Sequence, residues 1–142
     1  MATRLLLAAE PTSAGRARDF THKQLVSWEL NPLIDNAVAI VSELFTNAIT
    51  HGLANDAPAP TTRRRTAHPL LILIRHPHRL QIVMTDPSRT PPAMVQATET
   101  TPLDTSGRGL RIVGALSRRW AWAPLPTGGK AVWAILDDPN PQ

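Results

Sequence analysis

Three polar side chains recur at four-residue spacing in the segment VSELFTNAITHG, residues 41–52: Glu43, Asn47 and His51. Because an α-helix advances about 100° per residue, this spacing places them along one edge of a helix. An asparagine oxygen is a neutral, hard ligand suited to Mg²⁺, which takes its other oxygens from phosphates and water. A carboxylate one turn earlier can polarise a hydroxyl group. The pattern predicts a metal ligand at Asn47 and a base at Glu43, although boundary residues of an amphipathic helix would look the same.

A second group of residues has the types expected of a nucleotide site. Asp86 closes the apolar stretch LQIVMTD, and a strand-end carboxylate can accept a hydrogen bond from the exocyclic amine of adenine. Gly107, Arg108 and Gly109 follow about 20 residues later, at the start of a predicted helix. Such glycines let backbone N–H groups approach phosphate oxygens, and an arginine adds a forked cation. Singly these signals are weak, but in this order they supply a metal ligand, a base contact and a phosphate cradle.

The helix predicted over residues 32–51 has to hold the polar edge beside a core. On a helical wheel with Leu33 at zero, Asn36, Glu43 and Asn47 cluster at roughly 280–320°, next to the apolar stripe rather than opposite it. We therefore expect them to line a cleft edge, half shielded by a sheet. The stripe itself consists of Leu33, Ala37, Ile40, Val41, Leu44 and Ala48.

The remaining elements indicate an α+β fold. Strands are expected at Leu5–Ala8, Leu70–Arg75, Leu80–Asp86 and in the hairpin RWAWAPL/KAVWAIL, and further helices from Ser13 to about Glu29 and from near Gly107. Ser13 and Asn31 are expected to be N-caps, with Gly52 ending the second helix. The order favours helices on one face of a mostly antiparallel mixed sheet, a two-layer sandwich in a single domain over residues 1–142. The segments 53–69 and 87–106 read as loops.

Composition narrows the function classes. No apolar run approaches the roughly 20 residues that span a bilayer, and the absence of cysteine excludes disulfides and thiolate chemistry, so a cytoplasmic protein without a membrane anchor is expected. The formal net charge is +4, partly from Arg63–Arg65 in the first loop. Direct nucleic-acid binding is disfavoured because aromatic stacking residues are scarce. Trp120, Trp122 and Trp133 alternate as strand residues and are expected in the core, and the five histidines show no metal-binding spacing.

The motifs together resemble those of the GHKL ATPases, which share the Bergerat nucleotide-binding fold. The stretch SELFTNAITHG, residues 42–52, resembles the N-box of that superfamily, Asp86 matches the aspartate of its G1 box, and GRGLRIV, residues 107–113, resembles its G2 box. GGKAVW, residues 128–133, stands where the last strands begin. The resemblance covers residues 16–136 and is strongest to the small anti-sigma-factor serine kinases of bacteria and their actinobacterial ATP-binding relatives.

Carried over residue by residue, the resemblance implies a site for ATP and Mg²⁺. Asn47 would hold the Mg²⁺ that bridges the triphosphate, Glu43 would activate the hydroxyl group of a protein serine, and Asp86 would read adenine. Four further residues would close on the phosphates as part of an ATP lid: Gly107, Arg108, Gly109 and Leu110. Kinase members of the group phosphorylate an antagonist protein and otherwise sequester a sigma factor. The resemblance therefore implies a regulatory protein whose partners are a sigma factor, an anti-anti-sigma antagonist or both. It also implies that the protein forms a homodimer.

The sequence departs from the family pattern around Asp86. The G1 pattern Asp-x-Gly-x-Gly reads DPSRT over residues 86–90, without glycine, and Lys130 and Ala131 occupy the region where a threonine is often found. Both changes could weaken ATP binding without touching Glu43 or Asn47. The alternative to an ATP-dependent regulator is therefore a non-catalytic protein-interaction module with a degenerate nucleotide site.

Overall fold

A computed structural model describes residues 1–54, 68–87 and 105–139 of the chain. Along the sequence it contains β1 (Ala2–Leu6), α1 (Ser13–Ser27), the 3₁₀ turn η1 (Asn31–Leu33), α2 (Ile34–Ala54), β2 (Leu70–His76), β3 (Arg79–Asp86), α4 (Thr105–Leu116), β4 (Arg119–Pro124) and β5 (Lys130–Asp137). Among these residues, no helix combines the length and the apolar character needed to cross a membrane.

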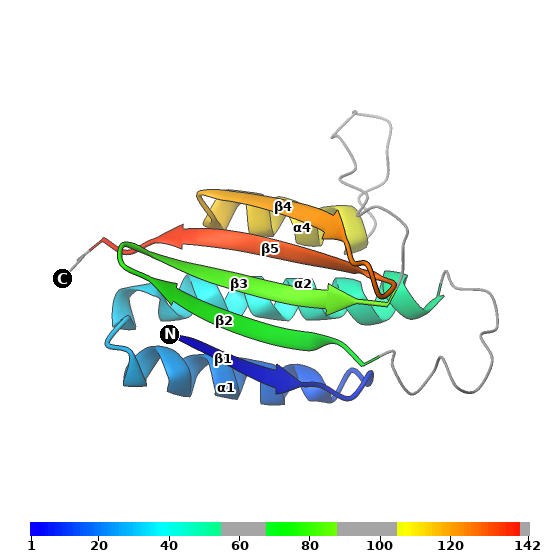
Figure 1. The fold of residues 1–142 in the computed structure, drawn as a ribbon, viewed down its shortest axis with the longest axis horizontal. Helices are drawn as coiled ribbons and strands as arrows, with labels where there is room; N and C mark the ends of the chain where they lie inside the picture. The colour runs from blue at the N-terminus through cyan, green and yellow to red at the C-terminus, as the bar shows by residue number, and fades with distance from the viewer. Residues whose placement is uncertain (55–67, 88–104, 140–142) are drawn as a thin grey trace.

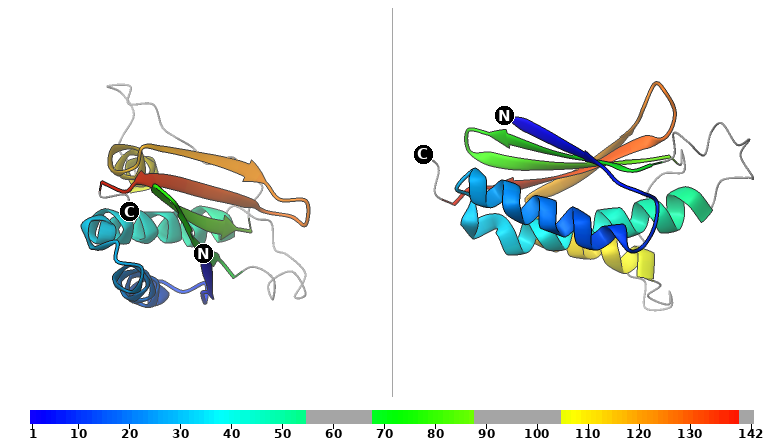
Figure 2. Two further views of the ribbon diagram at one scale, coloured as in Figure 1. Left: turned by 60° about the vertical axis from the view of Figure 1, so that its left-hand side comes forward. Right: turned by 90° about the horizontal axis from the view of Figure 1, so that it is seen from below.

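The described strands form one sheet, which the helices cover on one face (Figures 1 and 2). The strand order is β1-β2-β3-β5-β4, and every pairing is antiparallel. The predicted α+β two-layer sandwich is confirmed, but the sheet is antiparallel throughout its described strands rather than mixed. Tight turns join β2 to β3 and β4 to β5, and such turns connect only antiparallel neighbours, which accounts for two of the four pairings. The β1–β2 and β3–β5 pairings join strands that are separated by other elements, so short-range signals did not reveal their direction.

The core lies between the helices and the covered face of the sheet. The whole predicted stripe is buried, together with Phe45. Its first member, Leu33, lies in η1, because α2 begins at Ile34 rather than at residue 32. From β3, Leu80, Ile82 and Met84 point into this layer and are at most 1% exposed. Burial of this kind is worth about 1.5–3 kcal/mol for each large apolar side chain, so the stripe fixes which edge of α2 remains beside the core.

Alternation along the strands sends the intervening residues to the uncovered face, here called the open face. Val83 of β3 lies opposite Trp133 of β5 on this side. Trp120 and Trp122 pack against the core as predicted, but the prediction for Trp133 was wrong. The three tryptophans belong to two different strands, and the pairing register, which the spacing within one strand does not reveal, sets their faces.

Several element ends differ from their predicted positions. β1 starts three residues and ends two residues earlier than predicted, because Ala2–Leu6 is the stretch that pairs with β2, and the following Leu7 is fully buried. Ser13 is the first residue of α1 instead of its N-cap, and the preceding Thr12 makes no side-chain cap. Asn31 likewise lies inside η1 rather than capping it. The helix α2 continues past Gly52 to Ala54, since a glycine inside a helix costs only about 0.5–1 kcal/mol.

Candidate functional site

Four elements meet at one end of the molecule. Figure 1 shows the carboxyl end of α2, the end of β3, the start of β5 and the beginning of α4 gathered there. The helix α2 packs against both α4 and β3. The topology therefore brings the predicted metal ligand, base-reading carboxylate and glycine-rich segment, which are far apart in the sequence, to a common region.

The side-chain amide of Asn47 has a hydrogen-bond donor that is unsatisfied within the described part of the chain, as expected of a residue that binds a ligand. Its residue is half-buried, and its Nδ2 atom is buried without a hydrogen-bond partner among the residues that the structure describes. Leaving a buried amide donor unpaired costs about 1–3 kcal/mol. A ligand oxygen at this position would remove that penalty, and the other atom of the same amide is an oxygen that Mg²⁺ accepts as a ligand.

Glu43 lies one turn before Asn47 on the same helix and is also half-buried. The predicted half-burial of these two side chains is confirmed, while the cleft that they are expected to line stays a prediction. Asn36, which the helical wheel grouped with them, is exposed, so that part of the prediction was wrong. Asn36 is 11 residues from Asn47, about 16 Å along the helix, and lies near its opposite end. A wheel projection ignores this rise and therefore joins residues that the structure separates.

Asp86 is held in a buried ion pair at the end of β3. Its Oδ2 atom lies 2.9 Å from Nζ of Lys130, and the two side chains are 5% and 4% exposed. The two residues are directly opposite each other in the β3–β5 register. A carboxylate taken out of water requires such compensation, because an unpaired buried charge is strongly destabilising. Lys130, which occupies the region where the family pattern suggested a threonine, thus forms an ion pair with Asp86, the carboxylate predicted to contact the base.

A glycine turn sets the backbone around this pair. Gly128 and Gly129 have φ angles of 111° and 76°, which side-chain-bearing residues rarely adopt. A Cβ atom on Gly129 would lie 2.3 Å from the carbonyl oxygen of Asp86. Gly129 is therefore needed for the approach of the β4–β5 turn to the end of β3, which places Lys130 beside Asp86.

The glycine-rich segment lies at the start of α4. The helix begins at Thr105, two residues before the predicted start, so Gly107, Arg108 and Gly109 fall in its first turns, while their side-chain environments lie outside the described residues. Leu110 is 3% exposed and Val113 fully buried, and these two residues anchor the helix. The side chain of Leu110 therefore packs in the protein interior. Its predicted contact with a phosphate stays a prediction.

Several predictions concern residues that the structure does not describe. Most of the two predicted loops, including Arg63–Arg65 and the greater part of the lid, falls in 55–67 and 88–104. The side chain of His51 also lies outside the described part of the chain. One edge of each predicted loop is helical: residues 53–54 belong to α2 and residues 105–106 belong to α4.

The donor set suits a metal that is shared with a ligand. Within residues 1–50, 68–87 and 110–139, no three acidic, histidine or cysteine side chains come together to hold a metal ion. Mg²⁺ commonly keeps water and binds through one or two protein oxygens plus substrate phosphates, and a single asparagine oxygen fits that mode.

The fold is thus an antiparallel sheet covered by helices on one face, with the polar edge of α2 and the strand end that carries Asp86 at the same end of the molecule. The chain belongs to the histidine kinase-like ATPase domain family, whose family model matches residues 7–136. A comparison with curated proteins found no match. The predicted membership of the GHKL superfamily is confirmed.

Proposed function

We propose that this protein is an ATP-binding regulator that controls a partner protein in the cytoplasm through Mg²⁺-dependent nucleotide binding. The single observation that carries the proposal is the buried, unpartnered amide nitrogen of Asn47, in a chain of the ATPase-domain family. In this proposal Asn47 offers its oxygen to the Mg²⁺ and its nitrogen to a phosphate oxygen. Asp86 contacts the base, and the start of α4 faces the phosphates with its backbone N–H groups.

A finer proposal concerns phosphoryl transfer. Glu43 is a half-buried carboxylate one helical turn from Asn47, so it can accept the proton of a serine hydroxyl on a partner. The hydroxyl oxygen then forms a bond to the γ-phosphorus of ATP, the bond to the β-phosphate bridging oxygen breaks, and ADP leaves with that electron pair. By resemblance, the partners are a sigma factor and an antagonist protein that carries the serine, and the protein acts as a homodimer.

A second candidate function is a protein-interaction module without nucleotide binding. The observation that favours it is the Asp86–Lys130 pair, because the carboxylate that would read adenine already contacts a cation at 2.9 Å and is only 5% exposed. Pro87 and Ser88, which directly follow, stand where the family pattern has x-Gly, so the flexible glycine is missing. Under this candidate, the ion pair stabilises the fold and the base pocket stays closed.

Isothermal titration calorimetry separates the two candidates. Under the proposed function ATP binds in the presence of Mg²⁺ and much more weakly in EDTA, and Asn47→Ala weakens binding at least about tenfold, since a lost charged contact is worth about 1.5–3 kcal/mol. Asn36→Ala is the matched control, because it removes the same amide from an exposed position of the same helix. Absence of measurable ATP binding to the wild-type chain would refute the proposal and favour the interaction module.

A further inference from the structure

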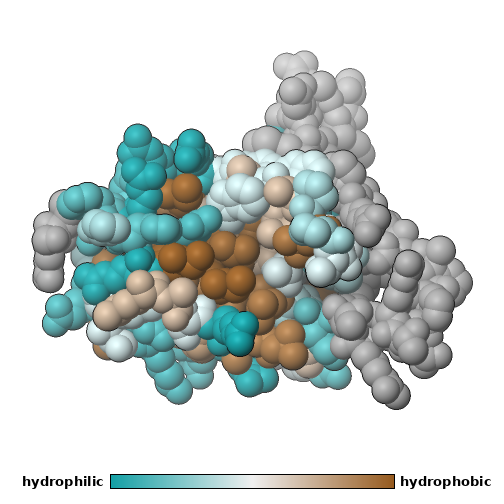
Figure 3. Space-filling model, viewed as in Figure 1, coloured by the Kyte–Doolittle hydropathy of each residue, from teal (hydrophilic) through white to brown (hydrophobic). Residues whose placement is uncertain are grey.

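The open face of the sheet is apolar at its centre. A row of residues crosses all five strands in register: Arg4, Ile72, Val83, Trp133 and Ala121. The neighbouring row consists of Ala2, Ile74, Gln81, Ile135 and Arg119. Figure 3 looks onto this face and shows apolar side chains gathered over its middle with polar ones around them. The described helices all lie on the other side of the sheet, so the described part of the chain leaves this apolar centre uncovered (Figure 2).

The charged residues around this centre are mostly basic. Arg4, Arg79 and Arg119 project from β1, β3 and β4 and are exposed. The carboxylate that alternation places on the same side, Asp137, is bonded to Arg118 at 2.7 Å. Arg4 and Arg119 stand on the two edge strands, and Arg79 lies at the β2–β3 turn. The apolar centre is therefore bordered by positive charge on three sides.

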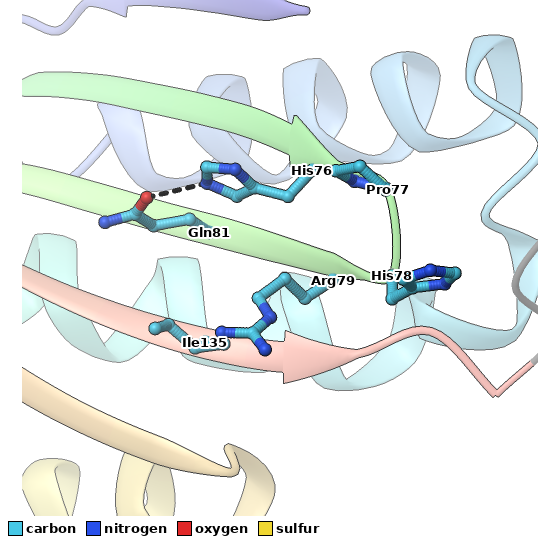
Figure 4. Close-up of a pocket in the computed structure, with 6 residues that line it drawn as sticks. All are labelled: His76, Pro77, His78, Arg79, Gln81 and Ile135. Carbon is cyan, nitrogen blue, oxygen red and sulfur yellow. Dashed lines mark hydrogen bonds between the residues drawn. The ribbon is translucent and has the colours of Figure 1, made fainter.

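A hollow marks the end of the open face beside the β2–β3 turn. It has a volume of about 430 Å³ and is lined by His76, Pro77, His78, Arg79, Gln81 and Ile135. Figure 4 shows the Arg79 side chain running toward Ile135, while His76 and Gln81 are joined by a hydrogen bond of 3.0 Å. The hollow thus combines an apolar floor with a guanidinium group and an imidazole, which suits a carboxylate carried on an apolar segment.

Dimensions and charge indicate what this face binds. Five strands spaced about 4.8 Å apart span roughly 24 Å, which is about the length of a helix of 16 residues. A second copy of the chain would bring the same arginines against one another, whereas acidic side chains beside an apolar stripe would complement them.

We propose that the open face binds an amphipathic helix of a partner protein, one with an apolar stripe flanked by acidic residues. The stripe packs on the central row around Val83 and Trp133. Its flanking carboxylates pair with Arg4, Arg79 and Arg119, and one of them enters the hollow beside His76. This docking surface lies on the face of the sheet opposite to α2 and does not depend on nucleotide binding, so the proposed function and this inference can fail separately.

Two synthetic helices test the proposal with the full chain. Both carry the same leucine stripe, one flanked by glutamates and the other by lysines, and each is titrated into ¹⁵N-labelled protein followed by NMR. The expected result is saturable binding of the glutamate peptide, with shifts concentrated on open-face residues such as Val83, Trp133 and Ile135. Binding of this peptide should weaken with added salt, and the lysine peptide should bind at least about fivefold more weakly.

Variants locate the contact. Arg79→Ala combined with Arg119→Ala should weaken the glutamate peptide at least about fivefold, while Arg16→Ala, which removes an exposed arginine from α1, should leave it unchanged. Leu6 lies two residues from Arg4 on β1 and therefore on the same open face, and its side chain is 57% exposed, so Leu6→Ser should weaken the glutamate peptide without loss of folding. Equal binding of both peptides, no binding, shifts confined to the helices, or a homodimer whose interface maps to Val83 and Trp133 would each overturn the proposal.

Discussion

Asp86 and Lys130 face each other across β3 and β5 with 2.9 Å between Oδ2 and Nζ, and both side chains are almost fully buried. This pair links the fold to the candidate site, because the same carboxylate closes the central strand and is the residue proposed to contact the base. It also explains how the chain accommodates a lysine at a buried position next to the candidate site. The buried ammonium group is compensated by the carboxylate opposite it.

The first prediction concerns the stability contribution of this pair. Lys130→Met replaces the ammonium-bearing side chain with an uncharged one of similar length and so removes the cation that compensates the Asp86 carboxylate. This change should lower the free energy of unfolding by about 3–5 kcal/mol. Urea denaturation measures the effect. The double change Asp86→Asn with Lys130→Met should recover a large part of the loss, and Lys23→Met, at an exposed position of α1, should change stability by less than about 0.5 kcal/mol. A Lys130→Met protein as stable as wild type would contradict the role of the pair.

Gly129 provides the second prediction. Alanine there would place a Cβ atom 2.3 Å from the Asp86 carbonyl oxygen at a φ angle of 76°, so Gly129→Ala should destabilise the protein by more than about 1 kcal/mol. The matched control is Gly15→Ala in α1, where the nearest atom would be an arginine side-chain nitrogen at 3.8 Å. That change should stabilise by about 0.5–1 kcal/mol. Thermal unfolding compares the two, and equal melting temperatures would show that the turn does not need its glycine.

Glu29 is strained at the end of α1 and gives a third prediction. Its φ angle is 59°, and the bonds Glu29 N–H to the Val26 oxygen and Leu30 N–H to the Leu25 oxygen form a Schellman motif. Glycine is the residue that this position favours, so Glu29→Gly should raise the free energy of unfolding by about 1 kcal/mol. Glu10→Gly, before α1, removes the same charge without relieving a positive φ angle and should not stabilise. A destabilised Glu29→Gly protein would be inconsistent with this helix end.

The fourth prediction separates catalysis from binding. Glu43→Gln retains size and polarity but cannot accept a proton, so transfer of the γ-phosphoryl group to a serine-bearing antagonist protein should fall by about 100-fold or more. The Kd for ATP should change little, because Glu43 is not proposed to hold the nucleotide. Radiolabel transfer and calorimetry measure the two quantities, with Glu10→Gln as an exposed control. Unchanged transfer would remove Glu43 from the proposed chemistry.

The sequence predicted the fold class and the core of α2 because these depend on short-range periodicity. The stripe from Leu33 to Ala48 repeats at helical spacing and is buried throughout. Helix ends were less predictable, since Ser13 and Gly52 have residue types typical of caps yet lie within helices. At such positions the packing of neighbouring turns outweighs a cap preference of about 1 kcal/mol.

Contacts between distant strands could not be predicted from spacing alone. Lys130 was noticed only as a departure from the family pattern, whereas its pairing with Asp86 depends on the β3–β5 register. The placement of Trp133 on the open face has the same origin. For the candidate site, the half-buried edge formed by Glu43 and Asn47 was predictable from helical geometry, but the unpartnered state of the Asn47 amide required coordinates.

The side-chain NH₂ resonances of Asn47, identified by their loss in Asn47→Ala, report most directly on whether this amide meets a nucleotide. Followed by ¹⁵N NMR, they should shift saturably when ATP is added with Mg²⁺, respond little to Mg²⁺ alone, and leave the corresponding signals of Asn36 in place. If the Asn47 pair stays unmoved at ATP concentrations that saturate the protein, or if nothing in the spectrum responds to ATP, then this amide has no phosphate to bind.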